Sequence, residues 1–194
     1  MKNIIQANMS TNIQLHFRVA TPDDAAQVAQ LVQAAFRHQD ARWTGPDAEL
    51  NRRFTMTPVE VLSTITNPDA VFLMATNDKG TLVGAMATIK KIEELARMAM
   101  LAVDPAFQAG GVGRRVLAHA EEYAINTWGV KNLGLNALNT RGLLIEWYER
   151  RGYVKTGETS PFPVEAFKEL ELPEDLHFVE MEKNVEGSKG AGSV

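Results

Sequence analysis

The stretch 98–117 most narrows what this chain can fold into, because it joins a strand pattern to a helix pattern across a glycine loop. Its first residues form an apolar run of strand length, which ends at the pair Asp104–Pro105, a typical strand breaker. Three glycines follow, namely Gly110, Gly111 and Gly113. At these glycines the backbone can take positive φ or lie close to a ligand. From Val112 onward apolar residues recur at helical spacing. We therefore expect a strand, a glycine loop and a helix.

A glycine loop that opens a helix is typical of an anion site. Free N–H groups and the helix macrodipole favour negative charge at a helix start. Arg114 and Arg115 lie in the expected first turn, where a cation opposes the dipole at a cost of roughly 0.3–1 kcal/mol. A bound phosphate would explain both arginines, and a plain junction with surface arginines is the other interpretation. The loop lacks the Gly-Lys-Ser/Thr of a Walker loop, and Val116 replaces the third glycine of a dinucleotide fingerprint.

The same stretch resembles motif A of the GNAT superfamily of N-acetyltransferases, which reads L-x-V-x-P followed by R/Q-x-x-G-x-G/A. The matching residues are Leu101, Val103, Pro105, Gln108, Gly111 and Gly113. The resemblance implies that the loop binds the pyrophosphate of acetyl-CoA and that the preceding strand pairs with the pantetheine arm. The cofactor-binding residues that it implies here are Leu101, Ala102, Val103, Gln108, Ala109, Gly110, Gly111, Val112, Gly113 and Arg114. The chain departs from the commonest pattern at Gln108, where Arg is usual, and at Ala109, where Gly is usual.

A second motif follows at the family's spacing. The run 147–153 resembles motif B, Leu/Phe-Tyr-x-x-x-Gly-Phe/Tyr, and the two motifs together cover roughly residues 95–157. In direct acetyl transfer the leaving thiolate, with a thiol pKa of about 8.5, needs a proton or a hydrogen-bond donor. A phenol with a pKa of about 10 can supply either at neutral pH. We expect Tyr148 to fill this catalytic role, with a core tyrosine on an amphipathic helix as the alternative.

Other candidate site residues have weaker support. Asn139 could hydrogen-bond the pantetheine arm, although the family pattern Asn-x-x-Ala is not kept around it. Arg141 could contact an acidic group of the substrate or pair with Glu146. Trp43 and Phe54 could line the acceptor cleft, or they could fill a small satellite core. No histidine or acid in the sequence is indicated as the general base.

Composition excludes several classes of function. The chain has 194 residues, a net charge of −4 and no cysteine. The charge argues against general nucleic-acid binding, and the missing cysteines exclude disulfides, thiolate zinc sites and a cysteine nucleophile. No apolar run approaches the roughly 18 residues of a membrane span. We expect a cytoplasmic protein without a metal site, with a flexible arm over 1–12, one domain over 13–184 and a disordered tail over 185–194.

The element pattern predicts an α/β fold with one mixed sheet of about seven strands and helices on both faces. The expected strands are 14–19, 70–76, 82–91, 95–103, 132–138, 153–157 and 176–183. Helices are expected from Thr21, over 47–54, from Thr57, over 112–128 with Gly129 as the stop, and before Gly152. In such sheets the ligand lies at the carboxyl end of the strand that feeds the glycine loop.

The leading functional hypothesis is an N-acetyltransferase that moves an acetyl group from acetyl-CoA to a primary amine by direct attack in a ternary complex. A non-catalytic sensor of acyl-CoA is the alternative, and a sensor would not need Tyr148. The acceptor, a small molecule or a peptide amine, is not identified by the sequence. Many GNAT relatives dimerise, which leaves a homodimer open.

Overall fold

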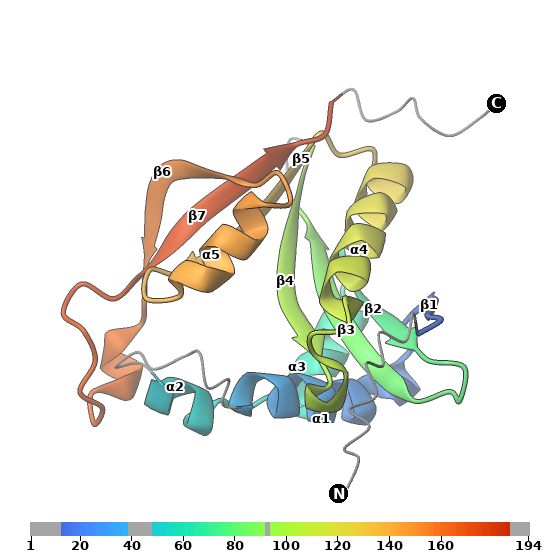
Figure 1. Cartoon of the computed structure of the whole chain (residues 1–194), viewed down its shortest axis with the longest axis horizontal. Coiled ribbons are helices and arrows are strands. Elements are labelled where there is room, and N and C mark those ends of the chain that lie inside the picture. Colours follow the sequence, from blue (N-terminus) through green and yellow to red (C-terminus); the bar gives the residue numbers. More distant parts are fainter. Residues whose placement is uncertain (1–12, 39–47, 92–93, 187–194) are drawn as a thin grey trace, which may run out of the picture.

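A mixed sheet forms the centre of the computed structural model, which describes residues 13–38, 48–91 and 94–186 (Figure 1). Its seven described strands lie in the order β1-β2-β3-β4-β5-β7-β6. Neighbouring strands are antiparallel except for the parallel pair β4–β5. The strands are β1 (His16–Val19), β2 (Ala70–Thr76), β3 (Leu82–Lys90), β4 (Leu95–Val103), β5 (Asn132–Leu138), β6 (Val154–Pro161) and β7 (His177–Asn184). The predicted mixed sheet is confirmed.

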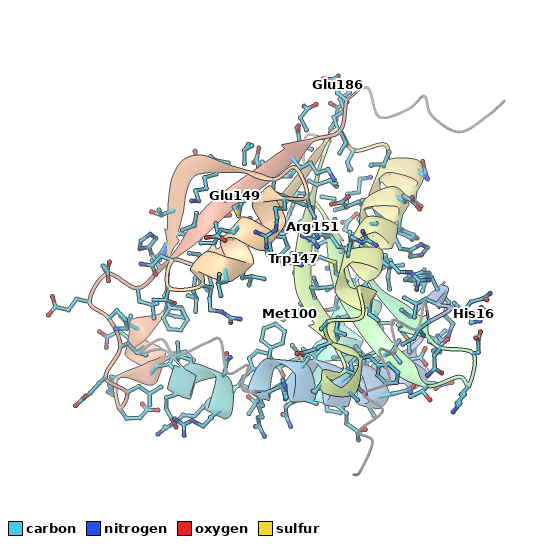
Figure 2. The ribbon with its side chains drawn as sticks, in the orientation of Figure 1. His16, Met100, Trp147, Glu149, Arg151 and Glu186 are labelled. Carbon is cyan, nitrogen blue, oxygen red and sulfur yellow. The ribbon has the colours of Figure 1, made fainter. Side chains whose placement is uncertain are left out.

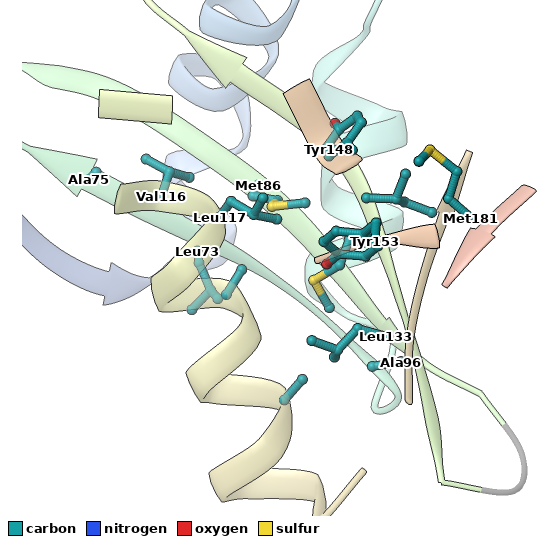
Figure 3. Packing of buried hydrophobic residues seen from close by; sticks show 14 of the residues in the cluster. Leu73, Ala75, Met86, Ala96, Val116, Leu117, Leu133, Tyr148, Tyr153 and Met181 are labelled. Atoms are coloured by element: carbon teal, nitrogen blue, oxygen red, sulfur yellow. The ribbon is translucent and has the colours of Figure 1, made fainter. Parts of the chain in front are cut away.

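Helices cover both faces of this sheet, as predicted. They are α1 (Ala25–Arg37), α2 (Ala48–Arg53), α3 (Pro58–Ile65), α4 (Val112–Trp128) and α5 (Gly142–Glu149). Period-two alternation in the strands divides the core in two. Leu73 and Ala75 of β2 belong to the cluster with α4 and α5, whereas Phe72 and Met74 belong to the cluster with α1 and α3. Figure 3 shows part of the first cluster, around Leu117, Tyr148 and Tyr153.

Helix α4 packs closely on the sheet along its predicted apolar stripe. Its buried residues are Val112, Val116, Leu117, Ala120 and Ala124. A Cβ added to Gly84 of β3 would lie 2.8 Å from Val116 Cγ2, so this strand position requires a glycine if the helix is to keep its distance. Gly129 caps the helix with a φ of 67° in the left-handed region, as the sequence predicted.

The entry to α1 is fixed by a buried carboxylate. Thr21 and Pro22 precede a short 3-10 turn (Pro22–Asp24) rather than the α-helix itself, which begins at Ala25. Asp24 accepts hydrogen bonds from the Thr21 backbone N–H at 2.7 Å and from both terminal nitrogens of Arg18 at 2.6 and 2.7 Å. The Arg18 hydrogen bonds, with those of Thr21, hold the pKa of Asp24 far below its usual range. Asp24 thereby ties β1 to the first helix.

We expect Asp24→Asn to lower the free energy of unfolding by about 1–2 kcal/mol at pH 7. Because the folded pKa of Asp24 is depressed, its contribution is present above the unfolded pKa of about 3.9 and is lost as the pH falls through the folded pKa. The variant should therefore lose less stability than the wild type on acidification below about pH 4. Urea unfolding at several pH values measures this. Asp23→Asn, an exposed neighbour in the same turn, is the matched control, and equal acid dependence in the wild type and Asp24→Asn would contradict the assignment.

The end of β6 and the start of the tail differ from the expectations. The predicted strand 153–157 extends as β6 to Pro161, and it pairs with β7 on either side of a register shift between Lys155 and Thr159. Its side chains are mostly exposed at the sheet edge, so no alternation marked its length. Val185, which we expected in the tail, is buried and its N–H donates to the Lys131 carbonyl at 2.8 Å. The predicted arm 1–12 and the tail from 187 onward lie outside the described residues.

In the part of the chain that the structure describes, every helix is too short or too polar to span a membrane. Within the same residues, no group of three or more His, Cys, Asp or Glu side chains is arranged to hold a metal ion.

Candidate active site

The sheet splits between its two parallel strands. β4 and β5 pair only from Leu95–Asn132 to Arg97–Gly134, and beyond this point they diverge (Figure 1). β5 continues to Leu138 on β7, and β4 continues to Val103 on β3. The edge of β4 that faces the split carries Leu101, Ala102 and Val103, the residues predicted to pair with pantetheine. A strand edge offers N–H and C=O groups to an extended ligand.

A bulge in β4 lies beside this split, and no residue pattern in the strand predicted it. Ala102 is opposite Ala85 and Ala99 is opposite Ala87, so two residues of β4 face one residue of β3. Met100, in the bulge, has a φ of 51°, which is uncommon for a residue other than glycine and costs on the order of 1–3 kcal/mol. Its side chain is part-exposed beside β4 (Figure 2). Bulges of this kind often re-aim the backbone next to active sites.

The glycine loop turns sharply into α4. Ala109 and Gly111 have φ values of 65° and 77°, and Gly111 is the residue that caps the helix. A Cβ added to Gly111 would meet no atom within 4 Å, so the loop faces open space there. The first N–H groups of a helix have no partner within the helix. The loop thus provides a helix start with free N–H groups and room beside it, and its use as an anion site stays a prediction.

The other loop residues differ in what they can offer a ligand. Gln108 lies exposed, and its side-chain N–H donates to the Val103 carbonyl at 3.3 Å. Ala109, Gly110 and Arg114 are exposed. Val112 has its side chain in the core, so only its backbone is available. A Cβ at Gly113 would make ordinary van der Waals contacts, at 3.4 Å to Val103 Cγ2 and 3.8 Å to Trp147 Cζ2.

Tyr148 lies on the buried side of α5, in the core cluster that also contains Met98 of β4 and Leu135 of β5. Its ring makes edge contacts with Trp147 and Tyr153, at centroid distances of 5.0 and 5.8 Å. Burial raises its pKa to about 12, although Arg141 and Arg151 act in the opposite direction. The phenol therefore stays protonated at neutral pH, which suits a proton donor.

The remaining predicted site residues lie around this centre. Both ends of the Asn139 amide contact the chain around the start of β7, since it donates to the Asp175 carbonyl at 3.1 Å and accepts from the His177 N–H at 3.3 Å. Arg141 lies near enough to Tyr148 to lower its pKa. Glu146, one expected partner of Arg141, instead lies 3.7 Å from Arg150. Trp43 lies outside the described residues.

Two aromatic contacts favour core packing over a role in the site. Phe54 stacks on Phe36 with centroids 4.4 Å apart, and both rings pack against the core cluster between the sheet and helices α1 and α3 rather than in a separate satellite core. His119 of α4 stacks on Phe17 of β1 at 4.2 Å, and burial lowers its pKa. A neutral ring in this position is a packing element between helix and strand.

A polar network on the sheet face away from α4 and α5 was not predicted. Glu180 of β7 accepts hydrogen bonds from Arg97 of β4 at 2.8 Å, from Asn136 of β5 at 3.1 Å and from the Ser160 hydroxyl. Burial acts to raise the pKa of Glu180, but the three hydrogen bonds together outweigh it and lower the pKa. The network links β4 to β5, β6 and β7 where the sheet divides. Because its four residues lie on four different strands, no local pattern in the sequence indicates this network.

We expect Arg97→Met to lower the free energy of unfolding by about 1–3 kcal/mol, because Glu180 would keep its charge in a part-buried place without its cation. Urea unfolding measures this change. Glu182→Gln, an exposed site on the same strand, is the control and should lie within about 0.5 kcal/mol of the wild type. A loss no larger in Arg97→Met than in this control would show that the ion pair does not hold the divided sheet together.

Comparison with known proteins agrees with this geometry. A family model described as "Acetyltransferase (GNAT) domain" matches residues 68–155, which include the split, the glycine loop and Tyr148. A search of curated protein sequences finds no match.

Solved structures share the fold over most of the chain. The ribosomal-protein-S18-alanine N-acetyltransferase from Escherichia coli is similar with a TM-score of 0.66 and 16% identity, over 93% of this chain and 97% of that one. The IAA acetyltransferase from Bacillus cereus has a TM-score of 0.61 and 14% identity, over 89% and 100%. The PaiA N-acetyltransferase from Thermoplasma acidophilum, in complex with coenzyme A, has a TM-score of 0.60 and 15% identity, over 89% and 99%. This chain therefore shares the fold of these acetyltransferases, and the GNAT domain model matches it over residues 68–155.

Proposed function

We propose that this acetyltransferase moves the acetyl group of acetyl-CoA to a primary amine by direct attack within a ternary complex. The observation that carries the proposal is Tyr148, a buried phenol with a pKa of about 12 in the cluster where β4 and β5 separate. A donor that stays protonated at this place serves a reaction whose leaving group is a thiolate. The absence of cysteine from the sequence supports direct transfer over a cysteine acyl intermediate.

The residues of the split and the loop fit a CoA thioester. The loop N–H groups from Gln108 to Gly113 would hold the pyrophosphate, and the open space at Gly111 leaves room for it. The edge of β4 at Leu101 and Val103 would pair with the pantetheine arm, and Asn139 would add a hydrogen bond. Arg114, at the first turn of α4, would add positive charge.

The chemical step needs two contributions from the protein. As the amine nitrogen bonds to the thioester carbon, that carbon's oxygen gains negative charge, which backbone N–H groups near Leu101 to Val103 would stabilise. As the carbon–sulfur bond breaks, Tyr148 would give its hydroxyl proton to the sulfur and would then regain a proton from solvent. The attacking amine loses a proton to water or to a base. Glu180 stays ionised on the far face of the sheet, but its three hydrogen bonds make it a structural anchor rather than our choice for this base.

The acceptor remains a small-molecule or peptide amine in this proposal. We propose Arg141 and Trp43 as residues that contact it, on the sequence argument given above. Names of structural neighbours cover acceptors as different as a ribosomal protein and spermidine, so the shared fold does not select one. A homodimer and a cytoplasmic location stay predictions from the sequence.

The test is titration calorimetry with acetyl-CoA, followed by a thiol-release assay over a panel of amines. We expect micromolar binding and release of CoA with one class of amine. Binding without release on any amine would favour the acyl-CoA sensor instead. No binding of acetyl-CoA would contradict the assignment of the glycine loop.

A further inference from the structure

An arginine is fixed on a tryptophan between α4 and α5. The guanidinium carbon of Arg151 lies 3.4 Å from the centroid of the Trp147 ring, and its Nη1 donates to the Trp147 carbonyl. Its Nε is buried and has no hydrogen-bond partner among the described residues. Figure 2 shows both side chains on the side of α5 that faces α4. Stacking and the carbonyl contact hold the planar cation in one orientation before any ligand binds.

The stacked pair is adjacent to the glycine loop. A Cβ added to Gly113 would lie 3.8 Å from Cζ2 of the Trp147 indole, so the indole links Arg151 to the start of α4. Arg114 is the next residue of that helix and is exposed. Two guanidinium groups, one from the first turn of α4 and one from the turn that follows α5, therefore lie beside the same helix start.

Their charges are not neutralised by the protein. Burial lowers the pKa of Arg151, and Arg150 and Arg114 lower it further by repulsion. Within the ranges that the structure describes, neither Arg114 nor Arg151 has a carboxylate within ion-pairing distance. Glu121 raises the pKa of Arg151 only weakly, and its Oε2 forms an ion pair with Lys183 Nζ at 2.7 Å. Two cations held near each other without a counter-charge are stabilised by a bound anion.

The proposed cosubstrate offers two anionic groups. The pyrophosphate is assigned to the loop N–H groups, which leaves the phosphate on the ribose 3′-oxygen. A phosphate monoester is largely dianionic at neutral pH, with a second pKa of about 6, and arginine binds such groups through two parallel hydrogen bonds. We propose that Arg151, seated on Trp147, binds the 3′-phosphate of CoA together with Arg114. This inference rests on the proposed function.

The test compares CoA with 3′-dephospho-CoA by titration calorimetry. The wild type should bind CoA roughly 10- to 100-fold more tightly, the range of a charge-assisted contact. Arg151→Met keeps an unbranched side chain over Trp147 but removes the charge. The variant should bind CoA about as weakly as it binds 3′-dephospho-CoA. Its affinity for 3′-dephospho-CoA should differ from that of the wild type by less than about twofold.

Arg150→Met is the matched control, because it removes the same charge from the adjacent residue, which already lies near Glu146. It should keep the preference for CoA. Arg114→Met is a second variant, which should also reduce the preference if Arg151→Met does not fold. This inference alone would be overturned if the wild type bound CoA and 3′-dephospho-CoA with equal affinity. It would also be overturned if Arg151→Met lost affinity for both ligands by the same factor. Failure of the wild type to bind either ligand would overturn the proposed function as well.

Discussion

Replacing Tyr148 with phenylalanine is expected to lower kcat about ten- to thousandfold, with little change in the KM for acetyl-CoA. The substitution removes only the hydroxyl group, so the ring keeps its contacts with Trp147 and Tyr153. The leaving thiolate would then lack its proton donor in the transition state, while ground-state binding would persist. Steady-state kinetics with the amine found by the thiol-release assay measures both constants.

Tyr153→Phe is the matched control for this experiment. Tyr153 is buried in the same cluster (Figure 3), where burial first and the nearby Glu121 of α4 second raise the pKa of its phenol. We expect kcat to stay within about twofold of the wild type, with any effect confined to stability. The raised pKa of Tyr148, about 12, also predicts no loss of kcat from phenol ionisation up to about pH 10. An unchanged kcat in Tyr148→Phe would remove this residue from the mechanism.

The second large effect is expected from Gly111→Val, which should weaken acetyl-CoA binding by at least about 100-fold while the fold is kept. A valine side chain would enter the open space that the pyrophosphate is proposed to occupy. It would also strain the loop, since Gly111 has a φ of 77° and a β-branched residue disfavours that region. Titration calorimetry and thermal unfolding separate the two effects.

Gly129→Val controls for the strain. Gly129 caps the other end of α4 with a φ of 67°, and a Cβ there also meets no atom within 4 Å. Both variants should lose similar stability, on the order of 1–2 kcal/mol, but only Gly111→Val should lose acetyl-CoA. Wild-type affinity in Gly111→Val would contradict the assignment of the loop, and a loss of affinity in both would attribute the effect to α4 as a whole.

Local signals allowed much of the fold to be predicted. The α4 boundaries followed from Gly111 and Gly129, because a helix start and a left-handed cap are set by residues within one turn. The apolar stripe of α4 and the alternation in β2 followed from periodicity alone. The edge strand β6 was predicted too short, because its side chains are nearly all exposed and such a strand needs no alternation of apolar and polar residues.

In the candidate site, the glycine loop and Tyr148 could be predicted from the residues alone, since each lies in one short motif whose chemistry depends on residue type and spacing. The point where β4 and β5 part, the network of Glu180 across four strands and the stacking of Arg151 on Trp147 are visible only in the folded chain. Those features depend on contacts between segments far apart in the chain, and the free energy of such contacts is set by packing and burial, which no single segment encodes.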